Sequence, residues 1–271
     1  MLKRTVSGII AVAVLLMIVW ADVATSLPFI NGALLILTLM ALYEMYKPFG
    51  FIKRFALALI GFAMGTLIFI NTYFEFLNIA SIIVFFIIVM FILAVTYHKT
   101  VSFSDISLLL FATLYISLGM LHIRLLVDSE NGFALLFTAL ISAFLTDTGA
   151  YFVGCAVGKH KLIPEISPKK TVEGSVGGTA VAILSLIVFS WILTYFGIKT
   201  NILNIVIIGF VTSVGSQFGD LSASMIKREL KIKDYGDIMP GHGGVLDRFD
   251  SLLFAAPIVY YLNIILPLFT N

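Results

Sequence analysis

Long apolar runs separated by short polar stretches make up most of this 271-residue chain. Each run is close to the length of about 20 residues that an α-helix needs to cross the hydrocarbon core of a bilayer. The pattern therefore predicts an all-α, polytopic membrane fold with about nine transmembrane helices. The expected spans are residues 5–21, 23–43, 55–72, 76–97, 106–127, 133–157, 175–196, 202–226 and 251–269.

The composition agrees with a protein embedded in a membrane. Hydrophobic residues make up 60% of the chain and charged residues only 12%, whereas about a quarter of the residues in an ordinary soluble domain are charged. The first apolar run follows Lys3 and Arg4, as in a signal peptide, but no small-residue cleavage site stands out after it, so we expect it to be retained. Cys155 is the one cysteine, which argues against an internal disulfide or a CxxC metal site.

Most lysine and arginine residues lie in loops on one side of the expected membrane. With the N-terminus in the cytoplasm, every Lys and Arg except Arg124 and Lys199 lies in a cytoplasmic loop or tail. Loops rich in these residues face the cytoplasm in membrane proteins. We therefore expect a multi-pass protein of the cell inner membrane, N-in and C-out, with the polar loops 158–174 and 227–250 on the cytoplasmic side.

Polar residues inside the predicted spans are concentrated in the C-terminal half of the chain. Residues 1–130 are interpreted as transmembrane helices that supply a scaffold and oligomer contacts. Their Asp22, Glu44 and Glu75 fall near span ends, where an interfacial carboxylate is the ordinary interpretation. Residues 131–271 are expected to be the catalytic part, whose helices form a polar cavity that faces the cytosol.

Charged and hydroxyl side chains in this half are candidates for a functional site. Asp147 lies about ten residues, or about 15 Å, from the inner end of its span, and a carboxylate at that depth is a functional candidate by default. The alternative is a neutral Asp147 that is hydrogen-bonded to a neighbouring helix. Asp220, Ser224 and Lys227 follow i, i+4, i+7 spacing and therefore share one helical face.

Two further carboxylates, Asp247 and Asp250, open the ninth span at i, i+3 spacing, where like charges repel. Carboxylates that converge with hydroxyl groups and lysines suit Mg²⁺, which takes oxygen ligands and typically uses one or two carboxylates plus substrate phosphates. The sequence has no zinc-type His/Cys spacing, no GxxxxGK[ST] phosphate loop and no GxGxxG fingerprint.

The loop that follows the sixth span mixes lysines with prolines and glycines. Pro164 and Pro168 prevent a long helix there. Gly174, Gly177 and Gly178 open the seventh span with bare backbone, which lets N–H groups approach a phosphate at a helix N-terminus. The lysines could instead touch anionic lipid headgroups. The Ser and Thr residues beside them favour phosphate binding.

These motifs together resemble the signature of the phosphatidate cytidylyltransferases, or CDP-diacylglycerol synthases. The match runs through residues 224–250 as S, KR, KD, PGHGG and DRFD, and residues 147–152, 158–162 and 167–174 are similar too. Cys155, Val172 and Ala223 depart from the family pattern, which affects secondary contacts. The resemblance implies transfer of CMP from CTP to phosphatidic acid, giving CDP-diacylglycerol and pyrophosphate with a divalent metal.

The resemblance and the residue chemistry together suggest roles for individual residues. Asp220 and Asp247 are the first candidates for Mg²⁺ ligands, with Asp147 and Asp250 as further ligands or supporting groups, and a second, monovalent cation is left open. His242 is expected either to position a phosphate or to cap a turn. The other expected catalytic or substrate-binding residues are Lys227, Arg228, Ser167, Lys169, Lys170, Thr171, Ser224, Gly243 and Arg248. The expected partners are CTP, phosphatidic acid and the bilayer, without nucleic acid, and a homodimer is left open.

Two other functions fit parts of the pattern. A CTP-dependent kinase of a polyprenol or other lipid alcohol would use a related scaffold but would need a general base. A secondary transporter would also carry intramembrane Asp residues and broken, Gly-rich helices. Transporters usually consist of two similar halves, whereas the polar motifs of this chain lie in its C-terminal half. Product analysis with labelled CTP distinguishes the three.

Overall fold

A computed structural model describes residues 29–74, 76–237 and 243–269 of the chain. Within these residues the fold is helical, with one short β-hairpin. The helices are α2 (Phe29–Tyr46), α3 (Phe55–Phe74), α4 (Ile79–Thr96), α5 (Phe103–Asp128), α6 (Gly132–Val157), α7 (Val172–Tyr195), α8 (Ile202–Glu229), α9 (Leu246–Phe249) and α10 (Leu252–Ile265), with a 3₁₀ turn η1 (Phe51–Lys53) after α2. The hairpin consists of β1 (Lys161–Ile163) and β2 (Ser167–Thr171).

The apolar runs become helices, as the sequence predicts. Seven helices in the described part of the chain are long and apolar enough to cross a membrane, and α10 is a shorter apolar helix. Each predicted span from the second to the ninth overlaps one of these helices, which confirms the all-α, polytopic membrane fold. The first predicted span, 5–21, lies outside the described residues, so the count of nine and the N-in orientation stay predictions.

The chain forms two compact units, and the first contains residues up to 121 together with 234–247. Within it, α2 and α5 are joined by a hydrogen bond between the buried hydroxyl groups of Tyr46 and Thr113, at 2.6 Å. Gly65 allows α3 to approach α2 closely, since a Cβ there would lie 2.6 Å from a methyl carbon of Leu42. Large apolar side chains on α4, such as Phe85 and Phe91, are exposed, which suits a surface in contact with lipid.

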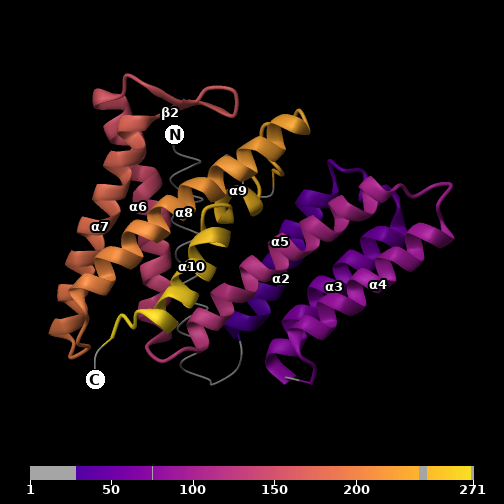
Figure 1. Ribbon diagram of the computed structural model, residues 1–271, viewed down its shortest axis with the longest axis horizontal. Coiled ribbons are helices and arrows are strands. Elements are labelled where there is room, and N and C mark those ends of the chain that lie inside the picture. The colour runs from indigo at the N-terminus through magenta and orange to yellow at the C-terminus, as the bar shows by residue number, and fades with distance from the viewer. Residues whose placement is uncertain (1–28, 75, 238–242, 270–271) are drawn as a thin grey trace. The chain divides into compact units, whose positions relative to one another are not determined.

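The second unit contains residues 122–233 and 248–271, and α6 packs closely on α7 within it (Figure 1). Small residues make this approach possible: a Cβ on Gly178 would lie 2.4 Å from the Thr146 carbonyl oxygen, and one on Gly174 would lie 2.6 Å from that of Ala150. The glycines that open α7 therefore serve helix packing. The N–H of Gly174 donates to Thr171 Oγ1, the N-cap of α7, at 3.1 Å.

Hydrogen bonds between hydroxyl and amide side chains join three helices of the second unit, α6, α7 and α8, within their apolar segments. Thr146 of α6 hydrogen-bonds to Ser213 of α8 at 2.7 Å, and Ser213 donates to Thr179 of α7 at 3.1 Å. One helical turn further along α8, Gln217 donates to Thr179 at 3.0 Å and accepts a hydrogen bond from Ser175. These groups satisfy one another where water is scarce.

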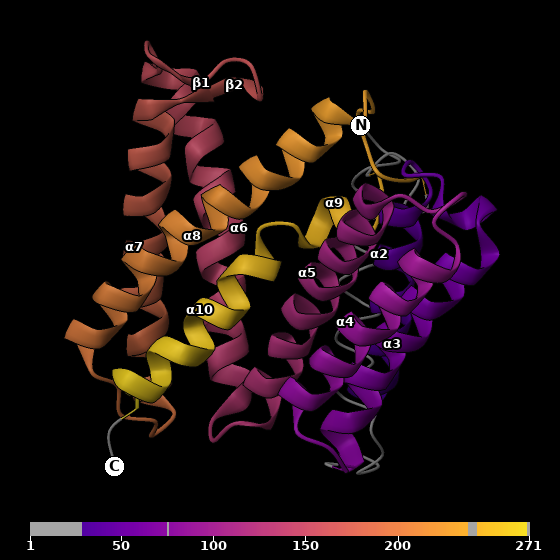
Figure 2. The same cartoon turned by 45° about the vertical axis from the view of Figure 1, so that its right-hand side comes forward.

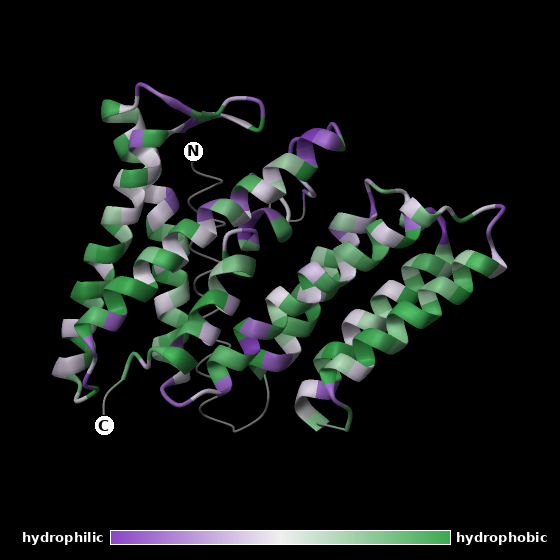
Figure 3. Ribbon diagram, viewed as in Figure 1, coloured by the Kyte–Doolittle hydropathy of each residue, from purple (hydrophilic) through white to green (hydrophobic). Residues whose placement is uncertain are grey.

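The β1–β2 hairpin was not predicted from the sequence. Its strands pair antiparallel, with Lys161 opposite Thr171 and Ile163 opposite Ser167. It lies at one end of the α6–α7 pair (Figure 2). Hydrophilic residues gather in the hairpin and at the C-terminal end of α8, whereas the bodies of the long helices are hydrophobic (Figure 3).

Candidate active site

An ion pair between the hairpin and α8 is at the centre of the candidate site. Lys170 Nζ of β2 lies 2.5 Å from Asp220 Oδ2 of α8, and each side chain is about a quarter exposed, at 22% and 25%. The hairpin brings the lysine to the carboxylate, although the two residues are far apart in the sequence. A predicted phosphate-binding residue and a predicted metal ligand are thus direct neighbours.

Two more carboxylates interact with Asp220. Asp147 of α6 and Asp250, which precedes α10, each interact electrostatically with Asp220 and with each other. Ser251 joins them, because its hydroxyl donates to Asp147 Oδ2 at 3.0 Å and its N–H donates to Asp250 Oδ1 at 2.8 Å. Gly219 lets this turn approach α8, since a Cβ there would lie 2.7 Å from the Asp250 carbonyl oxygen.

Electrostatics in this cluster disfavour a negative charge on Asp250. Burial, reinforced by the Asp220 carboxylate, raises the pKa of Asp250 to about 7, and the charge of Lys227 opposes this shift only in part. A nearby positive charge would stabilise the ionised form. We refer to Asp147, Asp220 and Asp250 as the carboxylate cluster.

The last turns of α8 carry the predicted hydroxyl and basic residues. Ser224 donates to Asp220 Oδ1 at 3.4 Å, which confirms that the two share a helical face. Arg228 Nε donates to the Ile166 carbonyl oxygen in the hairpin turn at 3.3 Å. Lys227 interacts electrostatically with Asp250. Arg228 is therefore bound to the hairpin, and Lys227 lies near the carboxylate cluster.

The remaining hairpin residues of the predicted site differ in exposure. Lys169 is exposed, Ser167 is partly exposed, and Thr171 is buried as the N-cap of α7. A group that sequence reasoning did not single out is Glu173, whose carboxylate accepts the N–H of His160 at 3.2 Å and contacts its Nδ1 at 2.6 Å. Glu173 thus joins the beginning of the hairpin to α7.

Asp247, another predicted ligand, belongs to the first unit. Its Oδ2 accepts hydrogen bonds from the N–H of Tyr235 at 2.8 Å and from that of Gly244 at 3.0 Å. Gly243, before it, has φ +82°, the left-handed conformation that glycine adopts most readily. Asp247 therefore organises the segment around it, and its role as a metal ligand stays a prediction.

Two further predicted site residues are Arg248 and His242. Arg248, the first residue of the second unit after Asp247, is exposed. His242 lies outside the described residues, as do Asp22 and Glu75.

The interfacial interpretation of Glu44 was wrong. Its side chain is only 1% exposed and accepts backbone hydrogen bonds from residues 245 and 246, which are about two hundred residues away in the chain at separations of 201 and 202. The sequence signal that could have raised this possibility was a carboxylate inside an apolar run, which usually has a partner in the protein. That partner could not be identified from the sequence.

The carboxylate cluster has donors that suit Mg²⁺, although they do not form a complete set of ligands. Within the described residues, no three His, Cys, Asp or Glu side chains are grouped closely enough to hold a metal ion. The cluster and the nearby Ser224 and Ser251 nevertheless offer only carboxylate and hydroxyl oxygens, the ligand type that Mg²⁺ prefers. Substrate phosphates supply the remaining oxygens in typical Mg²⁺ sites.

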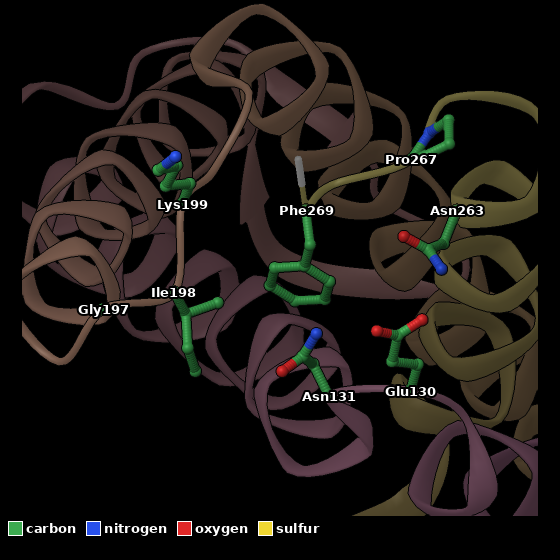
Figure 4. Close-up of a pocket in the computed structure, with 8 residues that line it drawn as sticks. All are labelled: Glu130, Asn131, Gly197, Ile198, Lys199, Asn263, Pro267 and Phe269. Atoms are coloured by element: carbon green, nitrogen blue, oxygen red, sulfur yellow. The ribbon is translucent and has the colours of Figure 1, made fainter. Parts of the chain in front are cut away.

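A separate cavity of about 410 Å³ lies at the other end of α6. Glu130, Asn131, Asn263 and Phe269 surround it (Figure 4). At the helical rise, Asn131 and Asp147 are about 24 Å apart along α6. This cavity therefore does not belong to the carboxylate cluster.

Comparison with known proteins identifies relatives over almost the full chain. The model of the cytidylyltransferase family matches residues 2–266. The phosphatidate cytidylyltransferase of Bacillus subtilis (strain 168) is 33% identical over 276 residues, which cover 97% of each chain. That of Staphylococcus aureus (strain COL) is 34% identical over 268 residues, 97% of this chain and 98% of the relative. That of Staphylococcus haemolyticus is 41% identical over 165 residues, 61% of this chain and 60% of the relative.

Proposed function

Because this chain belongs to the cytidylyltransferase family, we propose that it is a phosphatidate cytidylyltransferase. It transfers CMP from CTP to phosphatidic acid and releases pyrophosphate. The observation that carries the proposal is the Lys170–Asp220 ion pair beside Asp147 and Asp250, a cluster of charged groups in a protein that is mostly hydrophobic. The enzyme lies in the inner membrane with this cluster facing the cytoplasm, where CTP is dissolved.

The reaction requires a site that is open to both lipid and water. Phosphatidic acid carries two acyl chains and stays in the bilayer, whereas CTP is a polyanion that stays in water. A phosphate oxygen of phosphatidic acid attacks the α-phosphorus of CTP, the bond from that phosphorus to the bridging oxygen breaks, and pyrophosphate leaves. The protein need not supply a nucleophile, so catalysis consists of aligning two anions and neutralising their charge.

Basic residues of the hairpin and of α8 supply part of that neutralisation. Lys170, Lys227 and Arg228 bind phosphate oxygens, Arg228 through its planar fork and the lysines as point charges. Ser167, Lys169 and Thr171 of the hairpin, Ser224 of α8, and His242, Gly243 and Arg248 are the further substrate-binding candidates.

The carboxylates are the proposed ligands of Mg²⁺. Asp220 and Asp247 are the first candidates, with Asp147 and Asp250 as additional or supporting ligands. Bound Mg²⁺ would neutralise phosphate charge. Asp220 would then contact both the metal and Lys170, and the lysine would supply a positive charge near the metal-bound phosphates.

An assay of the purified protein tests the proposed activity. With CTP labelled in its α-phosphate, phosphatidic acid and Mg²⁺, we expect labelled CDP-diacylglycerol and pyrophosphate in a one-to-one ratio, and no product when EDTA is added. Release of CDP with phosphorylation of a lipid alcohol would identify a kinase instead. The absence of turnover in phosphatidic acid vesicles would contradict the proposal.

The orientation can be tested without reference to activity. In a Cys155→Ser background, a cysteine that replaces Lys161 is expected to react with a membrane-impermeant thiol reagent only from the cytoplasmic side. One that replaces Lys199 is expected to react only from the opposite side. The physical basis is the distribution of Lys and Arg between loops. Labelling of position 161 from outside intact cells would contradict a cytoplasmic active site.

A further inference from the structure

The first unit contains a buried carboxylate that the proposed reaction does not use. Glu44 lies in the last turn of α2, and its side chain is 1% exposed. A buried carboxylate is costly unless hydrogen bonds or an opposite charge compensate it. Here the N–H of Val245 donates to Oε1 at 2.9 Å and the N–H of Leu246 donates to Oε2 at 2.8 Å. Both oxygens therefore hold the segment that leads to Asp247.

Two glycines make room for this carboxylate. A Cβ on Gly236 would lie 2.5 Å from Glu44 Oε1, and one on Gly244 would lie 2.4 Å from Oε2. Real Cβ atoms do not approach so closely, so any larger residue at either position would displace the carboxylate or the segment. Neither glycine has a positive φ, so the need for glycine there is explained by the proximity of Glu44.

Gly244 links Glu44 to Asp247. Its backbone lies against the Glu44 carboxylate, while its N–H donates to Asp247 Oδ2 at 3.0 Å. Tyr235, which is 4% exposed, donates its N–H to the same Asp247 oxygen at 2.8 Å. Glu44 and Asp247 thus each contact both of the segments 234–237 and 243–247.

We propose that Glu44 is a positioning residue that holds Gly244, Val245 and Leu246 in place and thereby sets the position of the Asp247 carboxylate. The N-terminal helices therefore do more than supply a scaffold, because Glu44 of α2 contributes to the function of the signature residues 224–250. The effect on catalysis rests on the proposed transferase activity and on Asp247 as a metal ligand. The anchoring of the segment does not depend on either.

The anchoring is tested by thiol protection in the full-length protein. Val245 is fully buried and uses its backbone N–H to contact Glu44, so Val245→Cys in a Cys155→Ser background is a probe that reacts only when the segment opens. Glu44→Gln keeps the volume but turns an NH₂ group toward one of the two backbone donors. Because hydrogen bonds to charged acceptors are among the strongest, we expect the labelling rate to rise about tenfold or more.

A control on the same helix separates this effect from general loosening of α2. Thr38 is also fully buried in α2, and its hydroxyl donates to the Leu34 carbonyl oxygen at 2.7 Å. Thr38→Val removes this buried polar group without touching residues 234–247. Labelling at Val245→Cys is expected to stay within about twofold of the parent in this control. Equal rates in Glu44→Gln and the parent would overturn the proposal.

The catalytic part is tested through the dependence of activity on Mg²⁺. If Glu44 positions Asp247, Glu44→Gln should raise the Mg²⁺ concentration required for half-maximal activity about tenfold, and added Mg²⁺ should restore part of kcat. A role limited to stability would lower the amount of active protein and leave that concentration unchanged. In that outcome the segment would still be anchored by Glu44, but the positioning of Asp247 would be rejected.

Gly244→Ala provides a second variant that keeps the Glu44 side chain and every backbone N–H. Its methyl group would displace the carboxylate, so we expect the same faster labelling and the same Mg²⁺ requirement. Combined with Glu44→Gln, it should add little, because both changes act on one contact. Full additivity would contradict a shared contact. If no CDP-diacylglycerol is formed even by the parent, the transferase proposal fails, while the labelling results still decide the anchoring.

Discussion

Asp220→Asn is expected to lower kcat/KM for CTP by about 100-fold, because metal ligands and the groups that support them commonly contribute tenfold to a hundredfold. Asparagine keeps the volume of the side chain and its hydrogen bond with Ser224, but it removes the negative charge that faces Lys170 and would hold Mg²⁺. The measurement is steady-state formation of CDP-diacylglycerol over a range of Mg²⁺ concentrations.

The control for Asp220 is an exposed carboxylate of the signature region. Asp237 is exposed, and Asp237→Asn should retain activity within about threefold of the parent, as expected for a surface charge. Asp247→Asn should resemble Asp220→Asn if Asp247 is also a ligand. Near-normal turnover of Asp220→Asn at low Mg²⁺ would exclude Asp220 as a metal ligand.

Lys170→Gln is expected to lower kcat/KM by roughly 10- to 100-fold. The change removes a charge that contacts Asp220 at 2.5 Å and that we assign to a substrate phosphate, and charge-assisted hydrogen bonds contribute about 1.5–3 kcal/mol. Lys161→Gln is the matched control, since Lys161 is an exposed lysine of the same hairpin. Activity of each variant is measured in vesicles with and without additional anionic lipid.

Two outcomes would contradict the role of Lys170. Recovery of Lys170→Gln by anionic lipid would indicate contact with headgroups, which contributes only about 1 kcal/mol per cation and is not specific. Recovery in the double variant Lys170→Gln/Asp220→Asn would indicate that each residue serves only to neutralise the other. We expect neither, because we assign Lys170 to a substrate phosphate and Asp220 to Mg²⁺.

The sequence predicted which parts of the candidate site share one element. Asp220 and Ser224 lie four residues apart on an α-helix, so their contact on α8 follows from helical geometry alone. The depth of Asp147 in its span could be estimated in the same way. The resemblance to a known family indicated the reaction and candidate residues for it, but it gave no distances between helices.

Contacts between distant elements could not be predicted. The pairing of Lys170 with Asp220 depends on a hairpin whose strands are only 3 and 5 residues long, too short to show a clear alternating pattern. The glycines at the start of α7 were expected to free backbone for a phosphate. The structure uses them to bring α7 against α6, a role that depends on the facing residues Thr146 and Ala150.

By itself the sequence determined the helices of this protein, and it predicts that the C-terminal half of the chain carries the chemistry. That information is local, because a run of apolar residues in lipid must satisfy its own backbone hydrogen bonds and therefore forms a helix wherever it lies. The tertiary structure alone decided that Glu44 is buried against Val245 and Leu246 and that Lys170 meets Asp220. Such contacts depend on how helices and loops pack, and a carboxylate in an apolar run gives no indication of which distant backbone will satisfy it.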